Sequence, residues 1–187
     1  ALPITNEKVV LDTSCGSGGF LLHALDKVRK QADAFYDKDK EPTRHKEYWH
    51  DFAECNLFGI EISEGIARTA KMNMIIHDME GQIEIGDTFK NPKFRSKGKL
   101  RTFDRVVANP MWNQNWFTEG DYDNDELDRF PAGAGFPGKS SADWGWVQHI
   151  HASMNAISRA AVVLDTGAVS RGSGNAGTNK EKTVRQW

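Results

Sequence analysis

Cysteine is scarce in this sequence of 187 residues, which contains only Cys15 and Cys55. Two cysteines build neither a disulfide framework nor a Cys-x-x-Cys zinc site, and this usage suits a reducing cytosol. A His-Glu-x-x-His pattern is absent, and His149 and His151 lie two apart, so on a helix they would not share a face. We therefore expect no structural disulfide and no metal site.

Long apolar runs and an excess of positive charge are also missing. No stretch is apolar for long enough to cross a membrane, and the first four residues pass at once into polar ones, unlike a signal peptide. The chain has 24 Lys and Arg against 26 Asp and Glu, which gives a formal net charge of -2. A basic nucleic-acid coat protein is therefore excluded, and contact with DNA or RNA would need a local patch or a partner. The length suits a single domain.

A glycine-rich loop stands between a short apolar run and a helical pattern near the start of the chain. Val9-Val10-Leu11 ends at Asp12, Cys15-Gly16-Ser17-Gly18-Gly19 follows, and the helical pattern begins at Phe20. Glycines allow the backbone to approach a ligand closely, and a helix start offers unpaired N–H groups, as in a nucleotide cradle. A dinucleotide fingerprint would need a third glycine at position 21, which is leucine. The pattern therefore favours a ligand without phosphates.

Two further predicted strands end beside acidic residues. Leu57-Phe58-Gly59-Ile60 is followed by Glu61, and Ile83-Glu84-Ile85 is followed by Gly86-Asp87-Thr88. In an open α/β sheet, an acid at the end of the second strand is placed to accept hydrogen bonds from ribose hydroxyls. The alternative is a solvent-facing charge at a strand end.

A fourth predicted strand, Phe103 to Ala108, runs into Asn109-Pro110-Met111-Trp112. The ligand crevice of an open α/β sheet lies outside the carboxyl ends of its strands, so this tetrapeptide would enter it. An amide acceptor beside a flat aromatic surface suits a planar nitrogen base held by its exocyclic amine. The alternative is an Asn-Pro turn that closes a strand, with Trp112 filling the core.

The remaining segments have weaker patterns. Residues 31–51 have no clean period and are expected to form a surface insertion or an irregular helix. Residues 90–101 are basic and rich in turns; we interpret them as a solvated loop, with contact to a phosphate backbone as the alternative. Helices are expected from Ser63, as N-cap, to about His77 and over 144–157, and a fifth strand over 160–164.

Residues 113–140 are polar and glycine-rich, and a loop of this length is usually functional or mobile. Within it, residues 133–140 match the P-loop pattern literally. The preceding residues 123–129 are acidic and cannot form the buried strand that a P-loop requires, so we do not predict ATP or GTP binding.

Five motifs occur in a characteristic order: Asp12-Thr13-Ser14-Cys15-Gly16-Ser17-Gly18-Gly19-Phe20-Leu21, Gly59-Ile60-Glu61-Ile62, Ala70-Lys71-Met72-Asn73-Met74, Gly86-Asp87-Thr88 and Asn109-Pro110-Met111-Trp112. In this order and spacing they resemble the modification (methyltransferase) subunit of type I restriction-modification systems, among the N6-adenine DNA methyltransferases. The similarity continues through residues 137–143 and 160–164 to Arg171-Gly172, so it covers most of the chain.

The resemblance implies an α/β, Rossmann-like fold that binds S-adenosylmethionine. Asp12, Gly16 and Gly18 would surround the methionine part of this cofactor, Glu61 would hold the ribose hydroxyls, and Asp87 the adenine amine. The implied cofactor-binding set is completed by the neighbours of these residues, Cys15, Ser17, Ile62 and Thr88. Residues 1–187 would then be a partial methyltransferase catalytic domain, truncated at both ends, which leads us to expect weak cofactor affinity and little or no methylation by this chain alone.

The resemblance also implies that the substrate is an adenine flipped out of DNA. Asn109 and the Pro110 carbonyl would accept both N6 hydrogens, so that the amine can attack the methyl group in line, and Trp112 would stack on the base. The short stretch between the glycine loop and Asn109 leaves no room for a target-recognition domain, so a separate specificity subunit would choose the DNA site. A restriction subunit is a second candidate partner, and the location would be the cytoplasm of a bacterium or archaeon.

One residue departs from the family pattern. The family usually has a second proline where this sequence has Met111, and methionine leaves the loop more mobile than proline does. Two alternatives therefore stay open. The chain could be a non-catalytic, methyltransferase-like subunit, or a methyltransferase that acts on glutamine in a protein.

Overall fold

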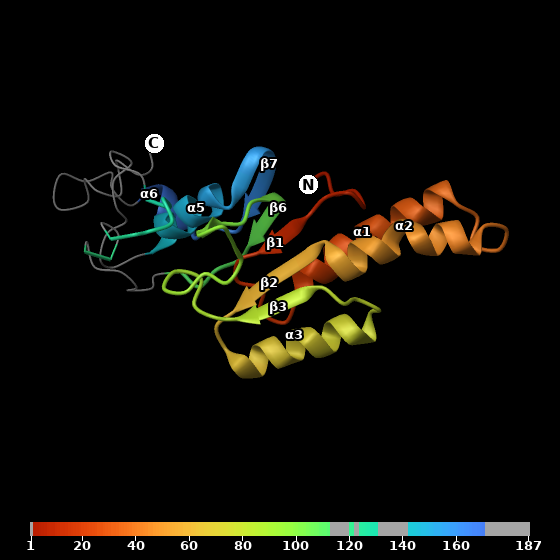
Figure 1. Cartoon of the computed structure of the whole chain (residues 1–187), viewed down its shortest axis with the longest axis horizontal. Helices are drawn as coiled ribbons and strands as arrows, with labels where there is room; N and C mark the ends of the chain where they lie inside the picture. Colours follow the sequence, from red (N-terminus) through yellow and green to blue (C-terminus); the bar gives the residue numbers. More distant parts are fainter. Residues whose placement is uncertain (1, 113–119, 122–123, 131–141, 171–187) are drawn as a thin grey trace. The chain divides into compact units, whose positions relative to one another are not determined.

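The structure is a computed structural model that describes residues 2–112, 120–121, 124–130 and 142–170 (Figure 1). The literal P-loop pattern at 133–140 lies outside these residues. In chain order the elements are β1 (Val10–Asp12), α1 (Gly19–Phe35), α2 (Pro42–Cys55), β2 (Leu57–Glu61), α3 (Glu64–Ile76), β3 (Gln82–Ile85), β4 (Arg95–Ser96), β5 (Lys99–Leu100), β6 (Phe103–Ala108), α5 (Asp143–Ala152), β7 (Met154–Val162) and α6 (Thr166–Ser170).

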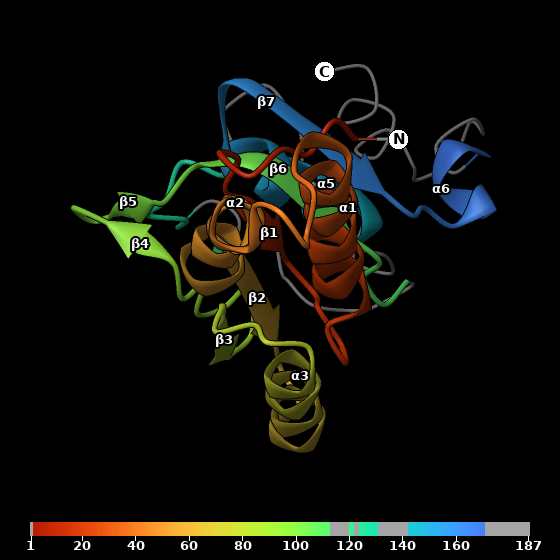
Figure 2. The same ribbon diagram turned by 90° about the vertical axis from the view of Figure 1, so that its right-hand side faces the viewer.

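Five strands form one sheet in the order β3-β2-β1-β6-β7, which can be followed from one edge to the other in Figure 2. The β1–β2, β2–β3 and β1–β6 pairs are parallel, and Asp12 at the end of β1 lies opposite Gly59 and Val107. The chain runs from β1 toward β3 on one side and places β6 on the other side of β1. In such doubly wound sheets, the ligand crevice lies where the strand order reverses, at the carboxyl end of the strands beside β1. The predicted α/β class is confirmed.

An apolar core joins α1, α2 and α3 to this sheet. It includes Leu21, Leu25 and Val28 from α1, Phe52 and Ala53 from α2, and Ala67, Ala70 and Met74 from α3. The positions on α1 and on α3 repeat every three or four residues, as expected for helices with one buried face, whereas the two on α2 are adjacent. The core holds the elements that precede and follow the glycine loop.

The strands predicted at Leu57–Glu61 and Phe103–Ala108 and the helix after Ser63 are confirmed. The Ser63 side chain accepts a hydrogen bond from the Ile66 N–H, as an N-cap should. Residues 31–51, expected to form a surface insertion or an irregular helix, instead belong mostly to two regular helices, because α1 continues to Phe35 and α2 begins at Pro42. Only Phe52 and Ala53 of α2 are buried, so its helical period is hidden among charged residues.

The predicted helix over 144–157 is too long, since α5 ends at Ala152 and β7 begins at Met154. The Ser158 hydroxyl donates to the Phe103 carbonyl, and Asn155 Nδ2 lies 3.0 Å from Asp104 Oδ1. These contacts join the start of β7 to β6, so tertiary pairing overrides the local helical pattern. Residues 90–101 also differ from expectation, because they contain the β4–β5 hairpin. In the part of the chain that the structure describes, no helix combines the length and the apolar character needed to cross a membrane.

The chain divides into two compact units. The first contains Ala1–Lys93, Phe103–Ala108 and Met154–Ala161, and the second contains Phe94–Thr102, Asn109–Ser153 and Val162–Trp187. The first unit therefore holds the sheet and the glycine loop, and the second holds the Asn109 motif, the β4–β5 hairpin and α5.

Candidate functional site

Backbone hydrogen bonds fix the glycine loop between neighbouring strands. The Cys15 N–H donates to the Ile60 carbonyl at 2.9 Å, and the Thr13 N–H donates to the Val107 carbonyl at 3.3 Å. Gly18 precedes α1 with φ +89, a left-handed conformation that favours glycine, and the position of a Cβ there would be 3.8 Å from Ala70 of α3. The loop is thus bounded by β2, β6 and α3.

Two side chains from other elements also hold carbonyl groups of this loop. The Thr88 hydroxyl, which is buried, donates to the Thr13 carbonyl at 2.7 Å. Asn73 Nδ2 of α3 donates to the Ser17 carbonyl at 2.9 Å. Thr88, expected at the cofactor, acts as an anchor of the loop in this structure. Asn73 occurs in one of the sequence motifs, yet the pattern alone gave it no role.

Glu61 connects the glycine loop to the start of α3. Its Oε2 accepts from the Gly16 N–H at 3.1 Å, and its Oε1 accepts from the Ser63 N–H at 2.8 Å. Each carboxylate oxygen has two lone pairs, so both oxygens can accept a further hydrogen bond. A carboxylate at the end of β2 with this free capacity is suited to a pair of ligand hydroxyls.

Asp12 is a buried carboxyl group at the end of β1. Its Oδ1 accepts from the Ser14 N–H at 3.1 Å. Burial raises the pKa of Asp12 to about 7; the Ser14 hydrogen bond opposes this shift and the nearby Glu61 charge adds to it. A cation bound nearby would favour the ionised form of Asp12.

The Cys15 side chain fills the space above β2. A Cβ added at Gly59 would lie 2.9 Å from Cys15 Sγ and 2.6 Å from Ile83 Cδ1. Burial raises the pKa of the Cys15 thiol, and the Asp12 and Glu61 charges raise it further. Cys15 is therefore a protonated packing residue in this structure and not a nucleophile.

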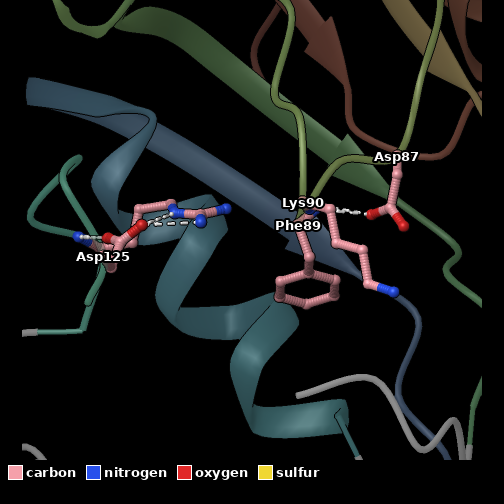
Figure 3. Close-up of polar contacts among 5 residues, drawn as sticks. Asp87, Phe89, Lys90 and Asp125 are labelled. Carbon is pink, nitrogen blue, oxygen red and sulfur yellow. Dashed lines mark hydrogen bonds and ion pairs between the residues drawn. The ribbon is translucent and has the colours of Figure 1, made fainter. Parts of the chain in front are cut away.

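Asp87 shapes the turn after β3. As Figure 3 shows, its carboxylate accepts from the backbone N–H groups of Phe89 and Lys90, and Oδ1 lies 2.9 and 3.0 Å from these nitrogens. Asp87 is partly buried, and Oδ2 is the oxygen that these two bonds leave available. Ile62, beyond the end of β2, is 53% exposed, so its side chain is accessible to a planar ligand.

Two hydroxyl groups in the loop bear on whether a polar ligand fits. Thr13 Oγ1 and Ser14 Oγ are buried and have no hydrogen-bond partner among the described residues. Buried polar groups normally have a partner, so these hydroxyls are consistent with a ligand that supplies one. The loop backbone, the two orphaned hydroxyls and the acids Asp12, Glu61 and Asp87 together match the needs of a charged nucleoside.

The Asn109 motif belongs to the second compact unit. Asn109 is exposed directly after β6, Pro110 is buried, and Trp112 is partly buried. Met111, at the position that departs from the family pattern, is 65% exposed. The Asn109 amide is therefore accessible to a substrate, and Met111 does not serve as core packing.

The same unit contains a buried ion pair that sequence reasoning missed. Both Asp125 and Arg129 have about 5% of their side chain exposed, and Asp125 Oδ1 lies 2.9 Å from Arg129 Nε and 2.7 Å from one of its terminal nitrogens. The hydrogen bonds of Asp125 are drawn in Figure 3. Burial, and to a smaller extent the Arg129 charge, lower the pKa of His149 to about 3. The i, i+4 spacing of Asp125 and Arg129 was the available signal.

A group that could hold a metal ion lies elsewhere, on α2. Ligand atoms of His50, Asp51 and Glu54 are within 4.8 Å of one another, and His50 Nδ1 is 3.3 Å from Glu54 Oε1. These residues lie in the last turns of α2, which precedes the amino end of β2. They are therefore not part of the carboxyl edge that holds the glycine loop.

Comparisons with known proteins agree with this geometry. Residues 2–186 match the sequence model of the family described as N-6 DNA Methylase. The chain is similar to the type I restriction enzyme MjaVIII methylase subunit of Methanocaldococcus jannaschii, with 34% identity over 193 residues, which cover 97% of this chain and 28% of that protein. The chain thus spans well under a third of that relative's own length.

Two solved structures share the fold. The methyltransferase subunit of a type I restriction-modification system from Streptococcus thermophilus superposes with a TM-score of 0.69 at 24% identity, covering 96% of this chain and 33% of that one. The M protein of the type I restriction enzyme EcoKI superposes with a TM-score of 0.66 at 23% identity, over the same shares of the two chains.

Proposed function

Because the chain belongs to the N-6 DNA methylase family, we propose that it transfers a methyl group from S-adenosylmethionine to N6 of adenine in DNA. The observation that carries this proposal is the glycine loop at the carboxyl end of β1, with Asp12, Glu61 and Asp87 at the ends of three adjacent strands. An exposed Asn109 directly follows β6, which pairs with β1 in the same sheet.

The cofactor is assigned to the first compact unit. S-adenosylmethionine supplies an electrophilic methyl group on a positively charged sulfur. Asp12 would provide the negative charge that balances this cation, and Glu61 would accept hydrogen bonds from the ribose hydroxyls. The Asp87 carboxylate would accept from the adenine amine, with the exposed Ile62 side chain against the ring.

The target base is assigned to the Asn109 motif. The lone pair of an adenine amine is delocalised into the ring, so the amine is a weak nucleophile. If the Asn109 side-chain oxygen and the Pro110 carbonyl accepted its two hydrogens, the lone pair would become available for attack on an electrophilic methyl group. Trp112 would stack on a base that has left the duplex. No general base would be needed before attack: the N–C bond would form as the S–C bond of the cofactor breaks, with its electron pair left on sulfur, and one N6 proton would then leave to solvent.

A specificity subunit is the partner that we propose for choosing the DNA site, and a restriction subunit is a second candidate. Met111 is the residue that favours the alternative function, a subunit that binds partners without catalysis. Its side chain is 65% exposed, so it neither stiffens the loop as proline would nor packs in the core.

Calorimetric titration of S-adenosylmethionine into this chain tests the proposal first. We expect Asp12→Ala and Glu61→Ala to weaken binding by about tenfold or more each, because each removes a charged partner of the cofactor. Glu84→Ala is the matched control, since Glu84 is an exposed acid within β3 and away from the strand end. Circular dichroism checks that each variant folds.

Transfer of labelled methyl groups then distinguishes the possible substrates. The expected result is that any incorporation into N6 of adenine in duplex DNA is abolished by Asn109→Ala, and that it is low with this chain, for which we expect little or no methylation. Incorporation into a glutamine-containing peptide instead would favour the protein-directed alternative. Cofactor binding by the full-length subunit with no transfer to either substrate would favour the non-catalytic alternative.

A further inference from the structure

The segment between β3 and β6 folds into a small β-hairpin with a fixed register. Arg95 pairs with Leu100 and Ser96 pairs with Lys99, and the Arg101 N–H donates to the Phe94 carbonyl at 3.0 Å. The two-residue turn between the strands has φ +51 at Lys97 and +78 at Gly98. Two positive φ values are the mark of a type I′ turn, whose twist matches that of the strands. The hairpin is thus a defined element and not an unstructured loop.

Positive charge is concentrated on this hairpin. Four of the nine residues from 94 to 102 are Lys or Arg and none is Asp or Glu, although acids outnumber bases in the chain as a whole. Arg95, Lys97 and Lys99 are all exposed. Because the chain has a net charge of -2, contact with a polyanion requires a local positive patch, and the hairpin provides one.

The register sets how these cations are arranged. Paired residues of a hairpin share a face, so Lys99 lies on the same face as Ser96 and, two residues along its strand, Arg101. Lys97 lies in the turn at the tip. The exposed residues Ser96, Lys97 and Lys99 therefore present ammonium and hydroxyl donors on this face and at the tip, which are groups that proteins use to contact phosphate oxygens.

We propose that the Phe94–Arg101 hairpin binds the sugar-phosphate backbone of duplex DNA. The inference rests on the proposed function, because it supplies a contact for the DNA that presents the adenine. The hairpin donors would fix the position of the duplex and would carry no sequence preference, since phosphates are the same at every base pair. This role is separate from that of the Asn109 motif, which would hold the target base.

The test compares two double variants by fluorescence anisotropy with a labelled duplex, at salt concentrations from about 50 to 200 mM. Lys97→Asn with Lys99→Gln removes two charges while keeping the turn, because Asn-Gly is a favoured type I′ sequence. We expect weaker binding and a salt dependence, log K against log salt, whose slope falls by about 1 for each lysine removed.

Lys38→Gln with Lys40→Gln is the control of equal charge. These lysines lie in the turn between α1 and α2, and they form exposed ion pairs with Asp33 and Asp37 at 2.7 and 3.0 Å. The control is expected to keep the slope of the unaltered chain. Equal slopes for both double variants, no binding of duplex DNA by the unaltered chain, or tighter binding of duplex RNA than of DNA would each overturn the proposal.

Cofactor titration of the same preparations separates this proposal from the proposed function. A chain that binds S-adenosylmethionine but shows no effect of the hairpin variant leaves the cofactor assignment intact and refutes the hairpin. DNA binding that depends on the hairpin, without detectable cofactor binding, supports the hairpin proposal and counts only against the cofactor assignment, which titration of the full-length subunit then decides.

Discussion

Ionisation of the buried Asp12 side chain lowers the stability of the folded chain. Its pKa is about 7 in the folded chain because the side chain is buried, against 3.8 when unfolded. Between these two values the folded state binds more protons, so the contribution of Asp12 to stability is full below pH 3.8 and is lost as the pH rises toward 7. Asp12→Asn should remove this loss, which amounts to up to about 1.4 kcal/mol of unfolding free energy per pH unit. Urea unfolding measured between pH 3.8 and 7 checks this. An unaltered slope in the variant would contradict the raised pKa.

At the scale of the element, β2 can pack closely against Cys15 of the glycine loop because residue 59 is a glycine. Gly59→Ala would bring a Cβ to 2.6 Å from Ile83 and 2.9 Å from Cys15, so both neighbours must move. We expect a loss of about 1–3 kcal/mol in the free energy of unfolding, together with weaker cofactor binding as Cys15 displaces the loop.

Gly65→Ala is the matched control, because Gly65 lies in the first turn of α3 with no atom within 4 Å of the added Cβ. It should leave cofactor binding unchanged and stabilise the chain by roughly 0.5–1 kcal/mol, since alanine is the better helix former. If both alanine variants behaved alike, the packing of Cys15 over β2 would not matter for the site.

Across the whole molecule, a second buried group opposes Asp12. The pKa of His149 in the second unit is about 3 when folded and 6.5 when unfolded, chiefly because of burial. Here the unfolded state binds more protons, so stability is lost as the pH falls below 6.5. His149→Gln should therefore make stability fall more steeply with rising pH between about 4 and 6.5, and Asp12→Asn should do the reverse. Changes of the same sign in both single variants would contradict this balance.

The sequence also sets how much of this molecule can be predicted. Strand ends at Asp12, Glu61 and Ala108 follow from short apolar runs bounded by polar residues, and the Ser63 cap from its residue type. By contrast, α2 buries too few residues to show a period, and the start of β7 depends on contacts of Ser158 and Asn155 with distant β6. The anchoring roles of Asn73 and Thr88 depend on residues 56 and 75 positions away, so no local pattern could reveal them.

The buried thiol of Cys15 can report when the glycine loop opens. Cys55 is exposed and Cys15 is buried with a raised pKa, so a thiol reagent should modify one sulfur at once and the other only when the loop opens. The slow phase of labelling then measures the rate and free energy of loop opening without any added probe. A ligand that closes the loop should slow that phase in proportion to the fraction of chains that bind the ligand. The labelling rate of Cys15 therefore provides an assay for ligands of this site.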